Sequence, residues 1–243
     1  MTDTLRTDGL TKIYDRVPVV DHIAIHANSG EVIGLLGRNG AGKTTTFLMI
    51  SGIVKPDDGQ IYLNGINIDN LPSHIRAEKG LIYLPQQHSI FMKASVYQNL
   101  FMVLQLYYNK KESDRRSQEL LNDFGLMHIK DSIAHQLSGG EKRRLEIARA
   151  MIMHPKFLFL DEPFTGIDPI TILEIQKIIT KLKERDIGII ITDHNVKDTF
   201  DITDRVYIIQ KGKVLSEGHP SFIVKEEKTR ELFLGDDFQW EGR

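Results

Sequence analysis

A glycine-rich loop near the N-terminus has the residue types that bind phosphate. Residues 37–44 read Gly-Arg-Asn-Gly-Ala-Gly-Lys-Thr and fit the pattern G-x-x-x-x-G-K-[ST] in full. The glycines let backbone N–H groups converge on an anion, and the N-terminus of a following helix adds positive potential. We expect Lys43 to contact the β- and γ-phosphates of a bound nucleotide and Thr44 to ligate Mg²⁺. The residues expected to bind the nucleotide here are Gly37, Arg38, Asn39, Gly40, Ala41, Gly42, Lys43, Thr44 and Thr45.

Two carboxylates follow a second apolar segment. Residues 157–160 are apolar, and Asp161 and Glu162 come directly after them. In an open α/β sheet, ligands bind at the carboxyl ends of the strands, so these side chains should lie beside the phosphate loop. Asp161 would hold Mg²⁺, directly or through water, and Glu162 would orient and deprotonate the attacking water. A solvated strand terminus is the alternative, which the phosphate loop upstream disfavours.

A third motif, Leu-Ser-Gly-Gly-Glu at residues 137–141, precedes a predicted helix. Ser138 can cap that helix, and Glu141 stands three residues later, as in a capping box. Capping does not explain Gly139 and Gly140, since adjacent glycines weaken a helix start. They do allow a ligand to approach the backbone closely, which indicates a second ligand contact.

Alternating strands and helices must position these motifs. The segments predicted as strands are 5–14, 19–27, 31–36, 59–64, 81–84, 157–160, 188–192, 205–210 and 214–218. The segments predicted as helices are 44–51, 95–108, 113–124, 140–153, 169–185 and 221–234. This alternation predicts an α/β protein with a parallel sheet, which a helical insertion interrupts.

Composition narrows the possible functions. The chain has 243 residues and a formal net charge of −2, so no global field attracts nucleic acid. It contains no cysteine, which excludes disulfides and thiolate metal sites and is typical of a reducing compartment. Its apolar runs are far shorter than the roughly 20 residues of a membrane helix, so any membrane role would be that of a peripheral subunit.

Taken in this order, the three motifs resemble those of ATP-binding cassette ATPases. The resemblance implies a P-loop NTPase with a mostly parallel RecA-like core, an N-terminal antiparallel β subdomain and an inserted helical subdomain. It also implies a homodimer that binds ATP and Mg²⁺. In such a dimer Ser138, Gly139 and Gly140 contact the γ-phosphate of ATP held by the second copy, so each site needs two chains.

The resemblance assigns further residues one at a time. Tyr14 resembles the aromatic residue that stacks on adenine, although it could instead pack in the core as a strand aromatic. Gln86 matches the glutamine that senses Mg²⁺ and water and joins the core to the helical insertion. Asp168 lies in the loop that crosses the dimer seam. His194 matches the histidine that reaches the γ-phosphate, with a purely structural histidine as the alternative.

The resemblance covers the whole chain as one cassette domain. Its nucleotide-binding core is expected at residues 1–87 and 154–220, and its helical subdomain, which carries the third motif, at 88–153. A C-terminal helix and tail should occupy 221–243. We expect Trp240, a lone aromatic, to lie in a mobile part of that tail.

Longer strings resemble a subgroup, the ATPases of bacterial lipopolysaccharide exporters. These strings lie at residues 83–86, 89–91, 95–99, 161–164, 166–169 and 191–195, and residues 233–238 are similar as well. The resemblance implies a place on the cytoplasmic face of the inner membrane and two permease subunits that dock near Gln86 and Phe91. The chain would then act on lipopolysaccharide only indirectly, through the permease.

Several other functions are weighed against this one. ATPases of branched-chain amino-acid importers are closely similar, but the string Thr-Asp-His-Asn at 192–195 argues against them. A cassette acting on ribosomes or DNA usually has two cassettes or a long coiled-coil insertion, and neither occurs here. A GTP switch would be expected to carry Asn-Lys-x-Asp. A scaffold without hydrolysis would be expected to lack Glu162 or His194.

Overall fold

The larger of two sheets carries the site. The computed structural model describes residues 2–235, 237–240 and 242. In spatial order the six strands are β11 (Lys213–Gly218), β10 (Arg205–Gln210), β4 (Val32–Gly37), β9 (Gly188–Thr192), β8 (Phe157–Asp161) and β7 (Leu81–Leu84). All neighbours are parallel except β11, which is antiparallel to β10. Strands β4, β8 and β9 are buried along their whole length, as continuous apolar strands covered on both faces must be.

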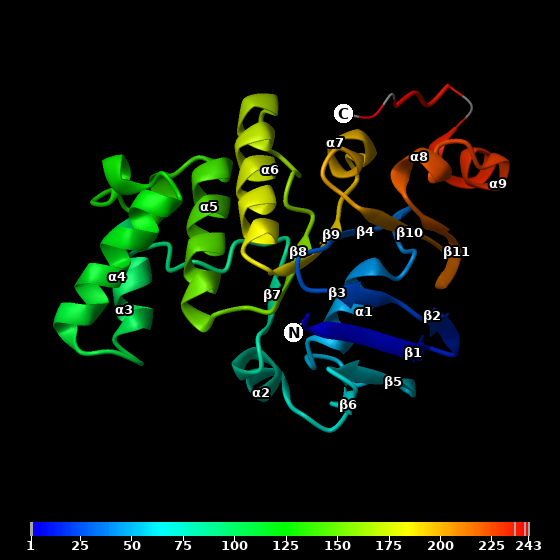
Figure 1. The fold of residues 1–243 in the computed structure, drawn as a ribbon, viewed down its shortest axis with the longest axis horizontal. Coiled ribbons are helices and arrows are strands. Elements are labelled where there is room, and N and C mark those ends of the chain that lie inside the picture. The colour runs from blue at the N-terminus through cyan, green and yellow to red at the C-terminus, as the bar shows by residue number, and fades with distance from the viewer. Residues whose placement is uncertain (1, 236, 241, 243) are drawn as a thin grey trace.

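The second sheet is antiparallel and lies beside the first (Figure 1). Its strands are β2 (Val17–Ile23), β1 (Thr4–Tyr14), β5 (Asp58–Leu63) and β6 (Ile66–Asn67), with β3 (His26–Asn28) also pairing β1. The single strand predicted at 19–27 is therefore two strands. It is interrupted where the N–H of Ile25 donates to the side chain of Thr7 at 3.0 Å.

Helix α1 (Lys43–Ile50) contacts both sheets and follows β4 directly. Its Phe47 is fully buried, and the ring meets that of Phe159 edge to face with centroids 5.4 Å apart. An apolar cluster between the two sheets surrounds the helix. The helix that begins at the phosphate loop is thus enclosed by the core.

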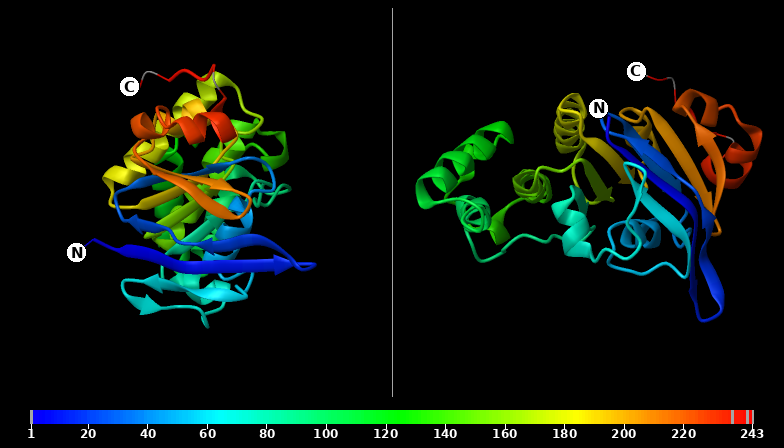
Figure 2. Two further views of the ribbon diagram at one scale, coloured as in Figure 1. Left: turned by 90° about the vertical axis from the view of Figure 1, so that its right-hand side faces the viewer. Right: turned by 60° about the horizontal axis from the view of Figure 1, so that its bottom comes forward.

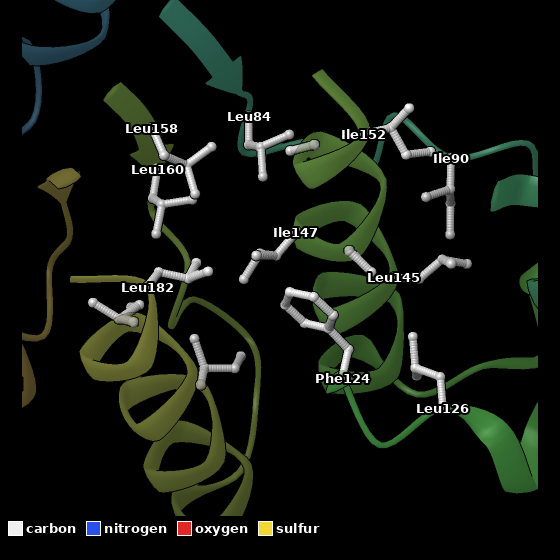
Figure 3. Packing of buried hydrophobic residues seen from close by; sticks show 14 of the residues in the cluster. Leu84, Ile90, Phe124, Leu126, Leu145, Ile147, Ile152, Leu158, Leu160 and Leu182 are labelled. Carbon is white, nitrogen blue, oxygen red and sulfur yellow. The ribbon is translucent and has the colours of Figure 1, made fainter. Parts of the chain in front are cut away.

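A helical region leaves the sheet after β7 and returns at β8, and it forms one end of the molecule (Figures 1 and 2). Its helices are α3 (Val96–Leu104), α4 (Lys110–Asp123), η1 (Met127–Ile129), η2 (Ala134–Gln136), α5 (Gly139–Ala150) and η3 (Met151–Met153). Before it comes α2 (Ser73–Glu78), and after it α6 (Pro169–Glu184) packs against α5. Figure 3 shows Ile147 on the side of α5 that faces Leu160 and Leu145 on the side that faces Leu126.

The C-terminal region differs from the prediction. The single helix expected at 221–234 is broken into α8 (Pro220–Ile223), α9 (Glu227–Thr229) and a π-helical turn, η4 (Arg230–Leu234). Trp240 is not loose: its ring meets Phe200 of α7 (Val196–Phe200) with centroids 5.5 Å apart, and its Nε1 donates to Asp201 at 2.9 Å. Residues 1, 236, 241 and 243 of the predicted divisions lie outside the described residues.

Candidate nucleotide-binding and hydrolysis site

The phosphate loop joins β4 to α1 as predicted. Gly42 has φ 105°, and a Cβ atom there would lie 2.5 Å from the carbonyl oxygen of Val19, so only glycine fits. Lys43 begins α1, and its Nζ donates to the carbonyl oxygens of Gly37 at 2.8 Å and Arg38 at 3.3 Å. The ammonium therefore lies across its own loop, where phosphate oxygens could replace the two carbonyls.

One cavity of about 340 Å³ gathers residues from distant parts of the chain. It is lined by Val19, Asn39, Gly40, Ala41, Gly42, Lys43, Thr44, Thr45, Gln86, Glu162 and His194. Burial lowers the pKa of Lys43, while the nearby charges of Glu162 and Asp161 oppose that shift. The cavity thus holds a partly desolvated cation together with the carboxylate of Glu162.

Asp161, at the end of β8, is buried and hydrogen-bonded through both oxygens. Its Oδ1 accepts from Thr44 Oγ1 at 3.3 Å and from Thr192 Oγ1 at 2.5 Å. Its Oδ2 accepts from the hydroxyl of Tyr83 at 3.0 Å. Burial and the Asp161 charge raise the pKa of Tyr83, so this hydroxyl donates in its neutral form. A solvated strand terminus does not describe this carboxylate.

Glu162 has the left-handed φ of 49°, which costs a non-glycine residue about 1–3 kcal/mol. Its N–H donates to the carbonyl oxygen of Thr192 at 2.8 Å and to the hydroxyl of Thr192 at 3.2 Å. Its Oε2 accepts from Gln86 Nε2 at 2.6 Å, and its Oε1 lies 2.6 Å from His194 Nε2. The strained backbone turns the carboxylate into the cavity, between the amide and the imidazole.

His194 follows β9 through a buried turn. The carboxylate of Asp193 accepts from the N–H of Phe164 at 2.8 Å and from the N–H of Asn195 at 2.9 Å. Burial raises the pKa of Asp193. The side chain of His194 is 44% exposed, so it faces the cavity and is not a core histidine.

Helix α5 is hydrogen-bonded both to the segment that carries Gln86 and to the end of β8. Arg143, which is buried, donates to the carbonyl oxygen of Pro85 at 3.2 Å and to that of Asp161 at 2.8 Å. It also pairs with the buried Glu146, which accepts from the N–H of Ser89 at 2.7 Å. The segment that carries Gln86 is therefore fixed to α5 at both ends.

The Leu-Ser-Gly-Gly-Glu segment lies apart from this cavity, since none of its residues is among the described residues that line it. The capping box is present: Ser138 Oγ accepts from the N–H of Glu141 at 3.3 Å, and Glu141 accepts from the N–H of Ser138 at 2.8 Å. Gly140 has a packing role as well, because a Cβ atom there would lie 1.9 Å from Thr171 Cγ2 of α6. Asp168 caps α6 and accepts from the N–H of Thr171 at 3.0 Å.

Four further predicted residues are not among the described residues that line the cavity, namely Tyr14, Gly37, Arg38 and Asp161. Tyr14 ends β1 and is 45% exposed, which rules out core packing, and Lys12 Nζ lies 5.5 Å from its ring centroid. Arg38 is exposed. Tyr83, Arg143 and Thr192 also hold the site together, and no functional motif in the sequence singles them out. A polar residue within or directly after an apolar strand was the available signal for Tyr83 and Thr192.

Comparisons with known proteins agree with this geometry. A family model described as ABC transporter matches residues 20–165. The lipopolysaccharide export system ATP-binding protein LptB of Acidithiobacillus ferridurans is 49% identical over 98% of this chain and 100% of its own. The protein of that name from Haemophilus influenzae is 46% identical over 97% of this chain and 98% of its own. A solved ATP-binding cassette of an ABC transporter, in its ADP conformation, is 25% identical with a TM-score of 0.86, over 96% of this chain and 99% of its own.

These likenesses confirm the predicted α/β fold of a P-loop NTPase. Among the described residues no helix is long and apolar enough to cross a membrane. The chain belongs to the ATP-binding cassette family, as an ATPase that binds and hydrolyses ATP.

Proposed function

We propose that this chain is the ATP-hydrolysing subunit of a lipopolysaccharide exporter and works on the cytoplasmic face of the bacterial inner membrane. Identity of 46–49% over nearly the whole chain to proteins named for lipopolysaccharide export supports the substrate. The observation that supports the chemistry is the carboxylate of Glu162, which Gln86 and His194 both contact inside the phosphate-loop cavity.

The residues at the cavity edge fit Mg²⁺. Thr44 Oγ1 and Asp161 Oδ1 lie 3.3 Å apart and are hard oxygen donors, and Gln86 can add an amide oxygen. Within the described residues no three His, Cys, Asp or Glu side chains form a complete metal site. That suits an ion that takes most of its ligands from phosphate and water. Bound there, Mg²⁺ would neutralise charge on the phosphate oxygens.

The protein groups then have separate roles in hydrolysis. Lys43 exchanges the carbonyl oxygens of its own loop for the β- and γ-phosphates. Glu162, oriented by Gln86, accepts a proton from the attacking water. His194 is half-exposed beside Glu162 and holds the γ-phosphate as charge develops on it.

Two copies are needed for a complete site. Ser138, Gly139 and Gly140 stand at the N-terminus of α5 but do not line the cavity of their own chain. Their place outside that cavity supports the role that the family resemblance implies for them, which is contact with the γ-phosphate held by the second copy, with Asp168 beside the seam and Tyr14 against adenine. The γ-phosphate is then the ligand that favours the closed dimer, and its loss favours the open one.

The permease docks on the helical region. A groove of about 730 Å³ is lined by Phe91, Met92, Lys93, Ala94, Gln98, Met102, Val103 and Leu106. Phe91 and Met102 are 47% and 41% exposed, which suits an apolar helix of a permease subunit. Gln86 lines the phosphate cavity and not this groove, so we assign it to the coupling between the two places, as the family resemblance implies.

Two experiments test these proposals separately. The tagged chain is purified from its native membranes in mild detergent, and the co-purifying polypeptides are identified. Two permease subunits with bound lipopolysaccharide are expected, whereas importer permeases with an amino-acid-binding protein would contradict the export function.

In the second experiment Glu162→Gln is expected to abolish ATP turnover and to trap an ATP-bound dimer. Normal turnover would remove Glu162 from the role of base.

A further inference from the structure

Thr192 is a buried polar residue to which neither the motifs nor the proposed mechanism gives a role. It is the last residue of β9 and is 0% exposed. In the parallel pairing of β8 with β9 it stands opposite Asp161. It is not among the residues that line the phosphate-loop cavity, so it can act only through its neighbours.

One hydroxyl group joins the two functional carboxyl residues. Thr192 Oγ1 donates to Asp161 Oδ1 at 2.5 Å and accepts from the N–H of Glu162 at 3.2 Å. A hydroxyl has one proton to donate and two lone pairs, so both bonds can form together. The carbonyl oxygen of Thr192 accepts from the same N–H at 2.8 Å. Tyr83, by contrast, donates to Asp161 but not to Glu162.

Asp161 and Glu162 both need contacts with other residues to keep their functional conformations. A free carboxylate rotates readily about its last bond, and Asp161 must present one oxygen toward Thr44. Glu162 must keep a backbone conformation that only its surroundings stabilise. Threonine suits this place because its β-branched side chain is stiff at χ1 in a strand and its hydroxyl direction is therefore set.

We propose that Thr192 is a positioning residue for ATP hydrolysis, which fixes the metal-binding carboxylate of Asp161 and the base Glu162 relative to each other. This inference rests on the roles proposed above for those two residues. Thr192 contacts Asp161 and Glu162 but does not line the phosphate-loop cavity, so its removal should disturb turnover and metal use more than nucleotide binding itself.

The variant Thr192→Val keeps the shape and the strand preference but removes the hydroxyl. We expect kcat to fall about 10-fold or more, as for other residues that orient metal ligands. KM for ATP should stay within about threefold, because the phosphate loop is unchanged. Thr192→Ser, which restores the hydroxyl, should recover most of kcat. Tyr83→Phe should raise the Mg²⁺ concentration that turnover requires but reduce kcat less than Thr192→Val does, since the N–H of Glu162 stays bonded to Thr192.

A second readout does not depend on turnover. The affinity for a fluorescent ATP analogue is measured in Mg²⁺ and in EDTA, and the gain due to Mg²⁺ should shrink in Thr192→Val while the EDTA value stays unchanged. The inference would be overturned if Thr192→Val lost affinity equally in both buffers, if its kcat were unchanged, or if Thr192→Ser did not recover kcat. Glu162→Gln is assayed alongside: if it is active the proposed mechanism fails, and if it is inactive while Thr192→Val is normal only this inference fails.

Discussion

Replacing Gly140 by alanine separates the packing of the third motif from its contact with nucleotide. Gly140 is buried in the first turn of α5, and its backbone is compatible with alanine. The added Cβ atom would lie 1.9 Å from Thr171 Cγ2 and 3.2 Å from Thr171 Cβ on α6. Such a contact cannot persist, so α5 and α6 must separate or Thr171 must rotate away from Asp168, which its hydroxyl contacts at 2.5 Å.

The size of the effect follows from two opposing terms. Overpacking of a well-packed contact costs about 1–3 kcal/mol. Alanine is a better helix former than glycine by about 0.5–1 kcal/mol, which offsets part of that cost. We therefore expect Gly140→Ala to lower the free energy of unfolding by about 1–2 kcal/mol. Gly139→Ala should lower it less, because its Cβ atom would lie 3.1 Å from Cγ2 of Ile167, a less severe contact than the one at Gly140.

A double-mutant cycle in urea tests this reasoning. Thr171→Ser removes the clashing Cγ2 atom but keeps the hydroxyl. When it is combined with Gly140→Ala, it should restore at least about 1 kcal/mol of the free energy of unfolding that Gly140→Ala loses. ATP turnover should remain lost in the double variant, because the glycine is also proposed to contact the γ-phosphate held by the second copy. If Thr171→Ser leaves the instability of Gly140→Ala unchanged, the steric argument is wrong. If it restores turnover as well, Gly140 acts through packing alone.

Three further predictions concern other parts of the structure. Arg76 is 1% exposed and donates four hydrogen bonds to backbone carbonyl oxygens, two of them at the C-terminal end of α1. Arg76→Met should therefore lower the free energy of unfolding in urea by about 3 kcal/mol or more. Bonds from Thr171 lower the pKa of Asp168, so its cap stabilises the fold at neutral pH and this stabilisation is lost as the pH falls. Between about pH 6 and pH 3, the wild type should lose more stability in urea than Asp168→Asn. Trp240 is the only tryptophan, and Phe200→Leu should move its emission maximum to longer wavelength in the folded protein.

Strands at 81–84, 188–192 and 205–210 are confirmed at the predicted residues. Each is a short apolar run bounded by glycine, proline or charge, so its limits are encoded locally. The gathering of Lys43, Gln86 and Glu162 in one cavity also follows from a general rule, since the carboxyl ends of neighbouring parallel strands meet at one edge.

Features that depend on distant contacts could not be predicted. Arg76 looks like a surface residue in a polar segment, and only the approach of the α1 carbonyls makes its burial tolerable. The tail that holds Trp240 has no periodic pattern, and its order comes from packing on Phe200, 40 positions away along the chain. The left-handed backbone of Glu162 is equally invisible in the sequence, because residue type alone favours another conformation there.

The hydrogen bonds of α5 have a consequence for coupling. Ser138, which caps the helix, faces the second copy in the proposed dimer, and the buried Arg143 of the helix is bonded to the carbonyl oxygens of Pro85 and Asp161. Its Arg149 donates to the carbonyl oxygen of Ser89 at 2.7 Å, beside the groove proposed for the permease. A 12-residue helix is a rigid rod of about 18 Å. A displacement at the dimer seam must therefore either break these buried bonds or carry the segment of Gln86 with it. The second is the less costly, because the first would leave donors of a buried guanidinium without acceptors, with only the pair to Glu146 of the same helix remaining.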